Sequence, residues 1–206
     1  TSDVEVSVLK KIDAIGKPLA DDCDVRFGVK VYQRGKSKPS QKGPEAEQRI
    51  FEANRRKSKD YYPYLRGSHV TPWCIESGKT WLKYGPHLAE PRTVDLFTGP
   101  RVLVRRIVAE RLVLAPTTEM LIADQLLHTV KPRTTNTDYR YLAAILHSRV
   151  IAYFVRKRFN RTEKTFPEIR IAELQQIPIR RIDFSDIADK ARHDKLVGLV
   201  DKMLTL

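Results

Sequence analysis

The segment between residues 26 and 59 concentrates the side chains that are best suited to bind an anion. It holds eleven Lys and Arg residues against three acids, an excess of eight positive charges in a chain whose formal net charge is +13. Such cations neutralise phosphates and release counterions, which gives sequence-independent affinity for nucleic acid. The segment therefore indicates contact with DNA. The alternative is a lysine-rich loop that only keeps the protein soluble.

The stretch VKVYQRGKSKPSQKG (29–43) interleaves these cations with a tyrosine and two glutamines. Arginine and glutamine side chains form bidentate hydrogen bonds with guanine and adenine in the major groove. We therefore expect this stretch both to grip phosphates and to read bases. The predicted DNA contacts within it are Tyr32, Gln33, Arg34, Lys36, Lys38, Gln41 and Lys42.

Other parts of the chain supply further predicted DNA contacts, namely Arg66, Arg105, Arg106, Lys131, Arg133, Asn136 and Lys164. Arg105 and Arg106 are neighbours on a predicted strand, so their side chains point to opposite faces. The inward one must pair with an acid such as Glu90, or extend its stem towards solvent. A structural salt bridge is the alternative for these two arginines, and an ordinary exposed lysine is the alternative for Lys164.

Sequence motifs for catalysis are absent. The chain has no G-x-x-x-x-G-K-[ST] or G-x-G-x-x-G loop, and no N-P-P-Y or N-P-P-F tetrapeptide to hold a flipped base. It has no histidine pair with metal-ligand spacing, and Glu76 and Lys79 are one residue too far apart for the acid-x-lysine arrangement of a metal-dependent nuclease. We therefore expect no catalytic residue, metal ion or cofactor in this chain.

Cysteine usage and hydropathy bound the class of protein. Cys23 and Cys74 are far apart and unaccompanied, which argues for a reducing compartment and against a disulfide scaffold or a zinc site. No apolar run approaches the roughly 18 residues that a membrane-spanning helix needs. These features predict a cytoplasmic protein that does not enter a membrane. The opening Thr1 and an apolar pattern still running at Leu206 indicate a fragment of a longer protein.

The spacing of apolar residues predicts an α+β chain in three parts. We expect a lead-in helix or linker at residues 1–15, a central domain at 16–184 and a C-terminal amphipathic helix at 185–206. Residues 138–159 predict a helix pair that is broken near His147, with Ser148 as the N-cap of the second helix.

Strands and loops are expected between these helices. Residues 25–32 alternate as a strand does, and residues 34–60 read as a long loop, which is uncommon in a compact domain unless it is functional or disordered. Several short strands follow up to Leu114, among them the valine-rich stretch 101–108. Residues 119–130 are ambiguous between helix and strand.

Six further blocks of sequence occur in a fixed order: YPYLRGSHV (62–70), WLKYGPHLAEPR (81–92), GPRVLVRRI (99–107), LHTVKP (127–132), YLAAILHSRVIAYFVR (141–156) and KTFPEIRIAELQQIPI (164–179). Together with GVKVYQRGKSKP (28–39), they resemble the TaqI-like C-terminal specificity domain. Such domains are target-recognition parts of N6-adenine DNA methyltransferases, including type IIG restriction-modification enzymes and related phage-defence methyltransferases. The resemblance covers about residues 16–206.

This resemblance implies a fold, a partner and a division of labour. The fold is a mixed β-sheet with packed helices, related to the recognition domains of type I specificity subunits. The partner is duplex DNA, read through the major groove while the target adenine is flipped into a neighbouring pocket. Catalysis belongs to an upstream methyltransferase domain of the same chain that binds S-adenosylmethionine, with Mg²⁺ if a nuclease is fused. The C-terminal helix then continues into a helical spacer or packs on the partner domain.

Two other functions remain open from the sequence. The chain could be a protein-interaction scaffold, in which the basic loop contacts an acidic surface of a methyltransferase or nuclease subunit and the C-terminal helix forms the main interface. A nuclease is a weaker alternative, because no carboxylate pair suited to a metal ion is evident.

Overall fold

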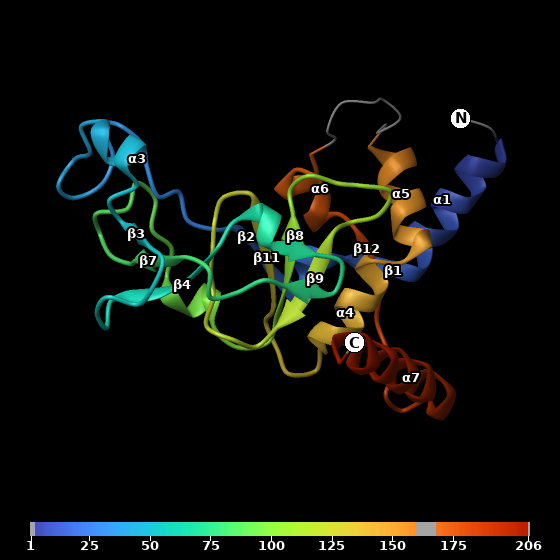
Figure 1. Ribbon diagram of the computed structural model, residues 1–206. Coiled ribbons are helices and arrows are strands. Elements are labelled where there is room, and N and C mark those ends of the chain that lie inside the picture. The colour runs from blue at the N-terminus through green and yellow to red at the C-terminus, as the bar shows by residue number, and fades with distance from the viewer. Residues whose placement is uncertain (1–2, 160–167, 206) are drawn as a thin grey trace.

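The computed structural model describes residues 3–159 and 168–205, and these form an α+β fold, as the sequence predicts (Figure 1). A small lobe with short strands lies at one end, a four-stranded sheet lies in the middle, and the longer helices gather at the other end. The end with the small lobe carries the basic loop, so this loop lies far from the longer helices.

The central sheet is antiparallel and has the strand order β2 (Cys23–Phe27), β11 (Leu127–Pro132), β8 (Arg101–Arg105), β9 (Leu114–Thr117). Neighbouring side chains of β8 enter different cores. Val102 and Val104 pack in the core on the helical side, while Leu103 packs in the core on the side of the small lobe. Both faces of the sheet are therefore covered, which explains why the apolar stretch 101–108 alternates only in part.

The outer sheet has the order β10 (Ile122–Ala123), β4 (Tyr61–Leu65), β7 (Trp81–Lys83), β3 (Glu52–Ala53), and it is mixed because β10 runs parallel to β4. The short helix α3 (Pro44–Gln48) lies beside it. The remaining short elements of this half are β5 (Val70–Thr71), β6 (Cys74–Ile75) and two 3₁₀ turns at Gly67–His69 and Val94–Phe97. Residues 119–130, ambiguous in sequence, thus contribute strands to both sheets.

Gly28 marks the point where the chain leaves the central sheet for the outer one. The strand predicted at 25–32 ends at Phe27, and only isolated bridges at Val29 and Lys30 continue it. At Gly28 the backbone passes so close to the carbonyl of Asp124 that a Cβ atom would lie 2.1 Å from the oxygen. Only glycine allows this approach, so the predicted strand is broken by a tertiary contact.

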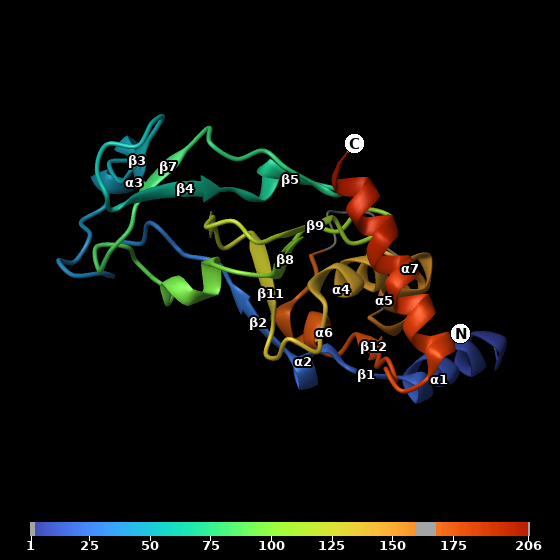
Figure 2. The same cartoon turned by 90° about the horizontal axis from the view of Figure 1, so that it is seen from below.

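The helical end is built from α1 (Asp3–Ile15), α2 (Leu19–Asp22), α4 (Tyr139–Leu146), α5 (Arg149–Arg158), α6 (Ile171–Gln175), α7 (Ile187–Leu204) and the strand pair β1 (Gly16–Pro18) and β12 (Pro178–Arg180). Figure 2 shows α7 running beside α4. The predicted break and cap are confirmed, because the Ser148 hydroxyl accepts the Ile151 N–H at 3.2 Å. None of the described helices combines the length and apolarity that crossing a membrane requires.

Candidate nucleic-acid interface

The loop that leaves the central sheet is fixed by one buried amide. Gln41 is only 5% exposed, and its Nε2 donates to the carbonyls of Val31 at 2.9 Å and His87 at 2.8 Å. Its Oε1 accepts the backbone N–H of Gln33 at 2.8 Å. Main-chain hydrogen bonds between Gln41 and both Lys36 and Gly35 close the loop. Residues 33–43 are therefore an ordered loop with an internal anchor.

We name residues 33–59 the basic lobe. Its Lys and Arg residues are exposed, and within the described part of the chain none of them forms an ion pair: Arg34, Lys36, Lys38, Lys42, Arg49, Arg55, Arg56, Lys57 and Lys59. A protein that needed these cations only for its fold would place carboxylates beside them. The unpaired state of the whole set favours an external anion as the partner.

Two of the three acids in the basic lobe have hydrogen-bond or ion-pair partners other than its Lys and Arg side chains. The Glu45 carboxylate accepts the backbone N–H groups of Lys42 and Gly43, and hydrogen bonds of this kind lower its pKa. The Glu52 carboxylate pairs with Arg66. Of the three, only Glu47 stands exposed without such a contact in the described structure. Glu52 therefore offsets a cation outside the basic lobe, whereas Glu45 remains a negative charge near Lys42.

A second run of cations lies close to the loop in space. Residues 54–59 (NRRKSK) join β3 to β4 and are exposed, and Figure 1 shows this connection at the same end of the molecule as residues 33–43. Arg56 shapes the connection, because its Nε donates to the Ser58 carbonyl at 3.3 Å. None of the DNA contacts predicted from the sequence lies in residues 54–59. The signal for the second was the same excess of charge.

Two of the predicted DNA contacts hold the loop in place from inside and do not present their side chains freely to solvent. The buried Gln41 amide has its oxygen and its nitrogen hydrogen-bonded, so the prediction that it reads a base is wrong for this conformation. Tyr32 stacks on Phe51, with ring centroids 5.5 Å apart, and its hydroxyl accepts the Phe51 N–H at 3.3 Å. Burial raises the pKa of Tyr32 to about 12. Of the loop's predicted contacts, Arg34, Lys36, Lys38 and Lys42 remain exposed, and Gln33 is half-buried.

Most predicted contacts outside the basic lobe are tied to acids. Arg66 pairs with Glu52, Arg106 with Glu168 at 2.7 Å, Lys131 with Asp95 at 2.9 Å and Arg133 with Asp24 at 3.1 Å. All four cations are at least partly exposed, and ion pairs at a protein surface are weak, so these residues stay predicted DNA contacts. Asn136 is exposed, Arg105 is half-buried without an ion pair in the described chain, and Lys164 lies outside the described residues.

The buried arginine of the central sheet is Arg101, which is not among the predicted DNA contacts. Its guanidinium donates to the carbonyls of Gly99 at 2.8 Å and Glu119 at 2.6 Å, and burial lowers its pKa to about 10. The expected acid Glu90 pairs instead with Arg92, at 3.2 Å. The alternative of a structural salt bridge holds for Arg106, but its partner is Glu168 and not Glu90.

Asp124 lies behind the basic lobe, near the Arg66–Glu52 pair. It accepts the Leu126 N–H at 2.8 Å, and burial raises its pKa to about 6. Among the residues that the structure describes, no group of His, Cys, Asp or Glu is arranged to hold a metal ion.

Comparisons with known proteins agree on one kind of domain. A family model described as the TaqI-like C-terminal specificity domain matches residues 62–179, which is more than half of the chain. No curated protein matches the sequence.

Several solved structures share the fold at low sequence identity. The type IIG restriction endonuclease BpuSI is 14% identical with a TM-score of 0.62, and the match covers 96% of this chain and 28% of that one. A chain from a study of complex assembly in a type I restriction-modification system is 11% identical with a TM-score of 0.57, covering 98% and 45%. The type IIL enzyme MmeI, solved in complex with DNA, is 10% identical with a TM-score of 0.51, covering 90% and 28%. The chain spans less than half the length of each of these proteins.

Proposed function

Because the chain belongs to the TaqI-like C-terminal specificity domain family, we propose that it recognises a short sequence in duplex DNA and that the basic lobe makes the contact. The observation that carries this proposal is the set of exposed cations in residues 33–59, none of which has an ion-pair partner in the described structure. Phosphates of DNA supply the missing counter-charge. The solved complex of MmeI with DNA, which shares the fold, supports the same partner.

The two loops of the basic lobe suit different parts of the task. Residues 54–59 place four cations on an exposed connection, so they contribute affinity through phosphates. The anchored loop 33–43 holds Gln33 and Arg34 on a fixed backbone, and such side chains pair with adenine and guanine edges. A loop that is already ordered loses less conformational entropy on binding, which favours specificity.

The finer part of the proposal concerns the parent protein. We infer an adenine-N6 DNA methyltransferase of a restriction-modification or phage-defence system, in which an upstream domain binds S-adenosylmethionine and receives the flipped adenine. Mg²⁺ enters only if a nuclease is fused. The described residues form no metal-ligand cluster, and the sequence has no motif for a nucleotide cofactor.

A protein interface accompanies DNA recognition in this account. Several apolar side chains near and along α7 are exposed: Phe184 at 49%, Ile187 at 86%, Leu199 at 49%, Met203 at 42% and Leu204 at 40%. Isolated exposed apolar residues are ordinary, but this series lies on a single helix and the turn before it. The series supports packing of α7 on another part of the parent protein, as the scaffold alternative also requires.

Titration with a duplex of random sequence at several salt concentrations tests the proposal. The variant R34A/K36A/K38A removes three cations from the anchored loop. We expect weaker binding to all sequences and a slope of log affinity against log salt that is shallower by about 2 to 3 units.

The matched control removes three cations from the helical end. Lys10, Lys195 and Lys202 are exposed and form no ion pair in the described structure, so K10A/K195A/K202A causes the same loss of charge. If both variants shift the slope equally, net charge alone drives binding and the basic lobe is not the contact.

A further inference from the structure

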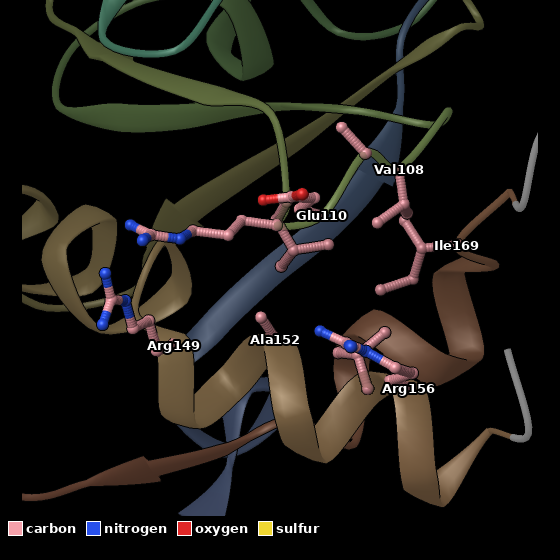
Figure 3. Close-up of a pocket in the computed structure, with 10 residues that line it drawn as sticks. Val108, Glu110, Arg149, Ala152, Arg156 and Ile169 are labelled. Atoms are coloured by element: carbon pink, nitrogen blue, oxygen red, sulfur yellow. The ribbon is translucent and has the colours of Figure 1, made fainter. Parts of the chain in front are cut away.

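A pocket that DNA recognition does not use lies at the helical end, between α5 and the loop that follows β8 (Figure 3). Its volume is about 660 Å³, which is within the range of small-ligand sites and also suits a short peptide segment. Figure 3 shows Arg149, Ala152 and Arg156 along one face of α5, with Val108 and Glu110 across the cavity.

The floor of the pocket is apolar. Leu112, Val155 and Ile169 line it with side chains that belong to the core of the helical end. Ala152 lies between them on α5 and leaves room above its methyl group. An aliphatic side chain that entered here would exchange water for contacts with hydrocarbon.

The rim of the pocket is positively charged. Arg111, Arg149 and Arg156 line it, and none of the three forms an ion pair within residues 3–159 and 168–205. Glu110 is the only acid among the residues that line the pocket. An apolar floor beneath unpaired guanidinium groups fits an occupant that is both anionic and aliphatic.

The spacing of two arginines narrows the class of occupant. Arg149 and Arg156 are seven residues apart on one helix face, so their backbones are separated by about 10 Å along the axis. A peptide in the polyproline II conformation covers about the same distance in three residues, and its three residues per turn place side chains i and i+3 on one face. DNA phosphates also pair with arginine, but the phosphate backbone has no aliphatic group to fill the apolar floor. The basic lobe, which is the proposed DNA contact, also lies at the other end of the molecule.

We propose that this pocket binds an acidic peptide segment of the catalytic methyltransferase domain that is proposed above. Two carboxylates of the segment pair with Arg149 and Arg156, and an aliphatic side chain between them enters the cavity over Ala152. Carboxylates match the guanidinium fork in a bidentate geometry, which fixes the orientation of the segment. The identity of the partner rests on the proposed function, but the chemistry of the pocket does not.

The test uses a terminally blocked peptide, Glu-Leu-Val-Glu, followed by NMR on the isotope-labelled chain. We expect saturable shifts of the backbone amides in residues 108–112 and along Ala152 to Arg156. The neutral peptide Gln-Leu-Val-Gln should bind at least tenfold more weakly, because it lacks both carboxylates.

Two variants separate charge from shape. R149E/R156E should weaken Glu-Leu-Val-Glu by at least tenfold and should bind Lys-Leu-Val-Lys better than the unmodified chain does. Ala152→Leu keeps both arginines but fills the cavity, so it should also reduce affinity for Glu-Leu-Val-Glu. Both arginines are exposed, and an unchanged amide spectrum away from the pocket confirms that each variant is folded.

Three results would overturn the proposal: no saturable shift at millimolar peptide, a shift that survives charge reversal, or displacement of the peptide by duplex DNA. The last result would make the arginines phosphate contacts. Peptide binding and duplex binding are each measured alone before the duplex is added to the peptide complex, so the pocket can fail while DNA recognition by the basic lobe stands, and the reverse also holds.

Discussion

Gln41 gives the sharpest mechanistic prediction, because it supports the DNA-reading loop without touching DNA. Gln41→Leu keeps the volume of the side chain and removes three hydrogen bonds, to Val31, His87 and Gln33. Each such bond contributes about 1 kcal/mol, so the ordered loop loses about 3 kcal/mol of its preference over open conformations. If the loop must be re-ordered on binding, duplex affinity falls by up to about a hundredfold.

Two measurements together check this mechanism. Fluorescence anisotropy with a labelled duplex should show weaker binding but an unchanged salt slope, because no phosphate-contacting cation is lost. Hydrogen exchange should show faster exchange at the Gln33 and Gly35 amides, which the loop protects in the native chain. Ser40→Ala, an exposed change in the same loop, is the control. Wild-type affinity with wild-type exchange would refute the anchoring role, and a shallower slope would show that cations of the loop lose phosphate contacts when the anchor is removed.

Two further predictions concern stability. Burial raises the Asp124 pKa to about 6 from an ordinary value near 3.8, so this carboxyl stabilises the fold below pH 4 relative to neutral pH, and stability is lost as pH rises through 6. Asp124→Asn should therefore raise the unfolding free energy at pH 7 by up to about 3 kcal/mol. It should also flatten the dependence of the unfolding free energy on pH between 4 and 7, and a pH dependence identical to that of the native chain would contradict this. Gly28→Ala should lower Tm by about 10 °C or more, because its Cβ would meet the Asp124 carbonyl at 2.1 Å, whereas Gly198→Ala, in open space within α7, should raise stability by about 1 kcal/mol. Equal effects of the two glycine changes in thermal denaturation would rule out the close approach.

Local signals predicted the helices well. Ser148 caps α5 as its position before an apolar stripe indicated, and Asp186 caps α7. These signals are carried by residues within one turn of each other, so sequence contains them. The charge of residues 33–59 was likewise visible, because composition needs no tertiary knowledge.

Contacts between distant residues were not predictable in the same way. Arg133 pairs with Asp24, more than a hundred positions away, and no periodic pattern in the sequence predicts such a pair. Gln41 looked like a base reader because its side chain suits one, but burial between Val31 and His87 decides its role. Gly28 breaks a regular strand because β10 passes beneath it, and that approach exists only in the folded chain.

The central claim is that duplex DNA covers the basic lobe, and lysine protection tests it most directly. The unmodified chain is treated with an amine-reactive reagent with and without duplex DNA, and the modified lysines are read by mass spectrometry. The account predicts protection of Lys36, Lys38, Lys57 and Lys59, while Lys195 in α7 reacts equally in both samples. Protection of Lys195 with continued reaction of these four lysines would contradict it.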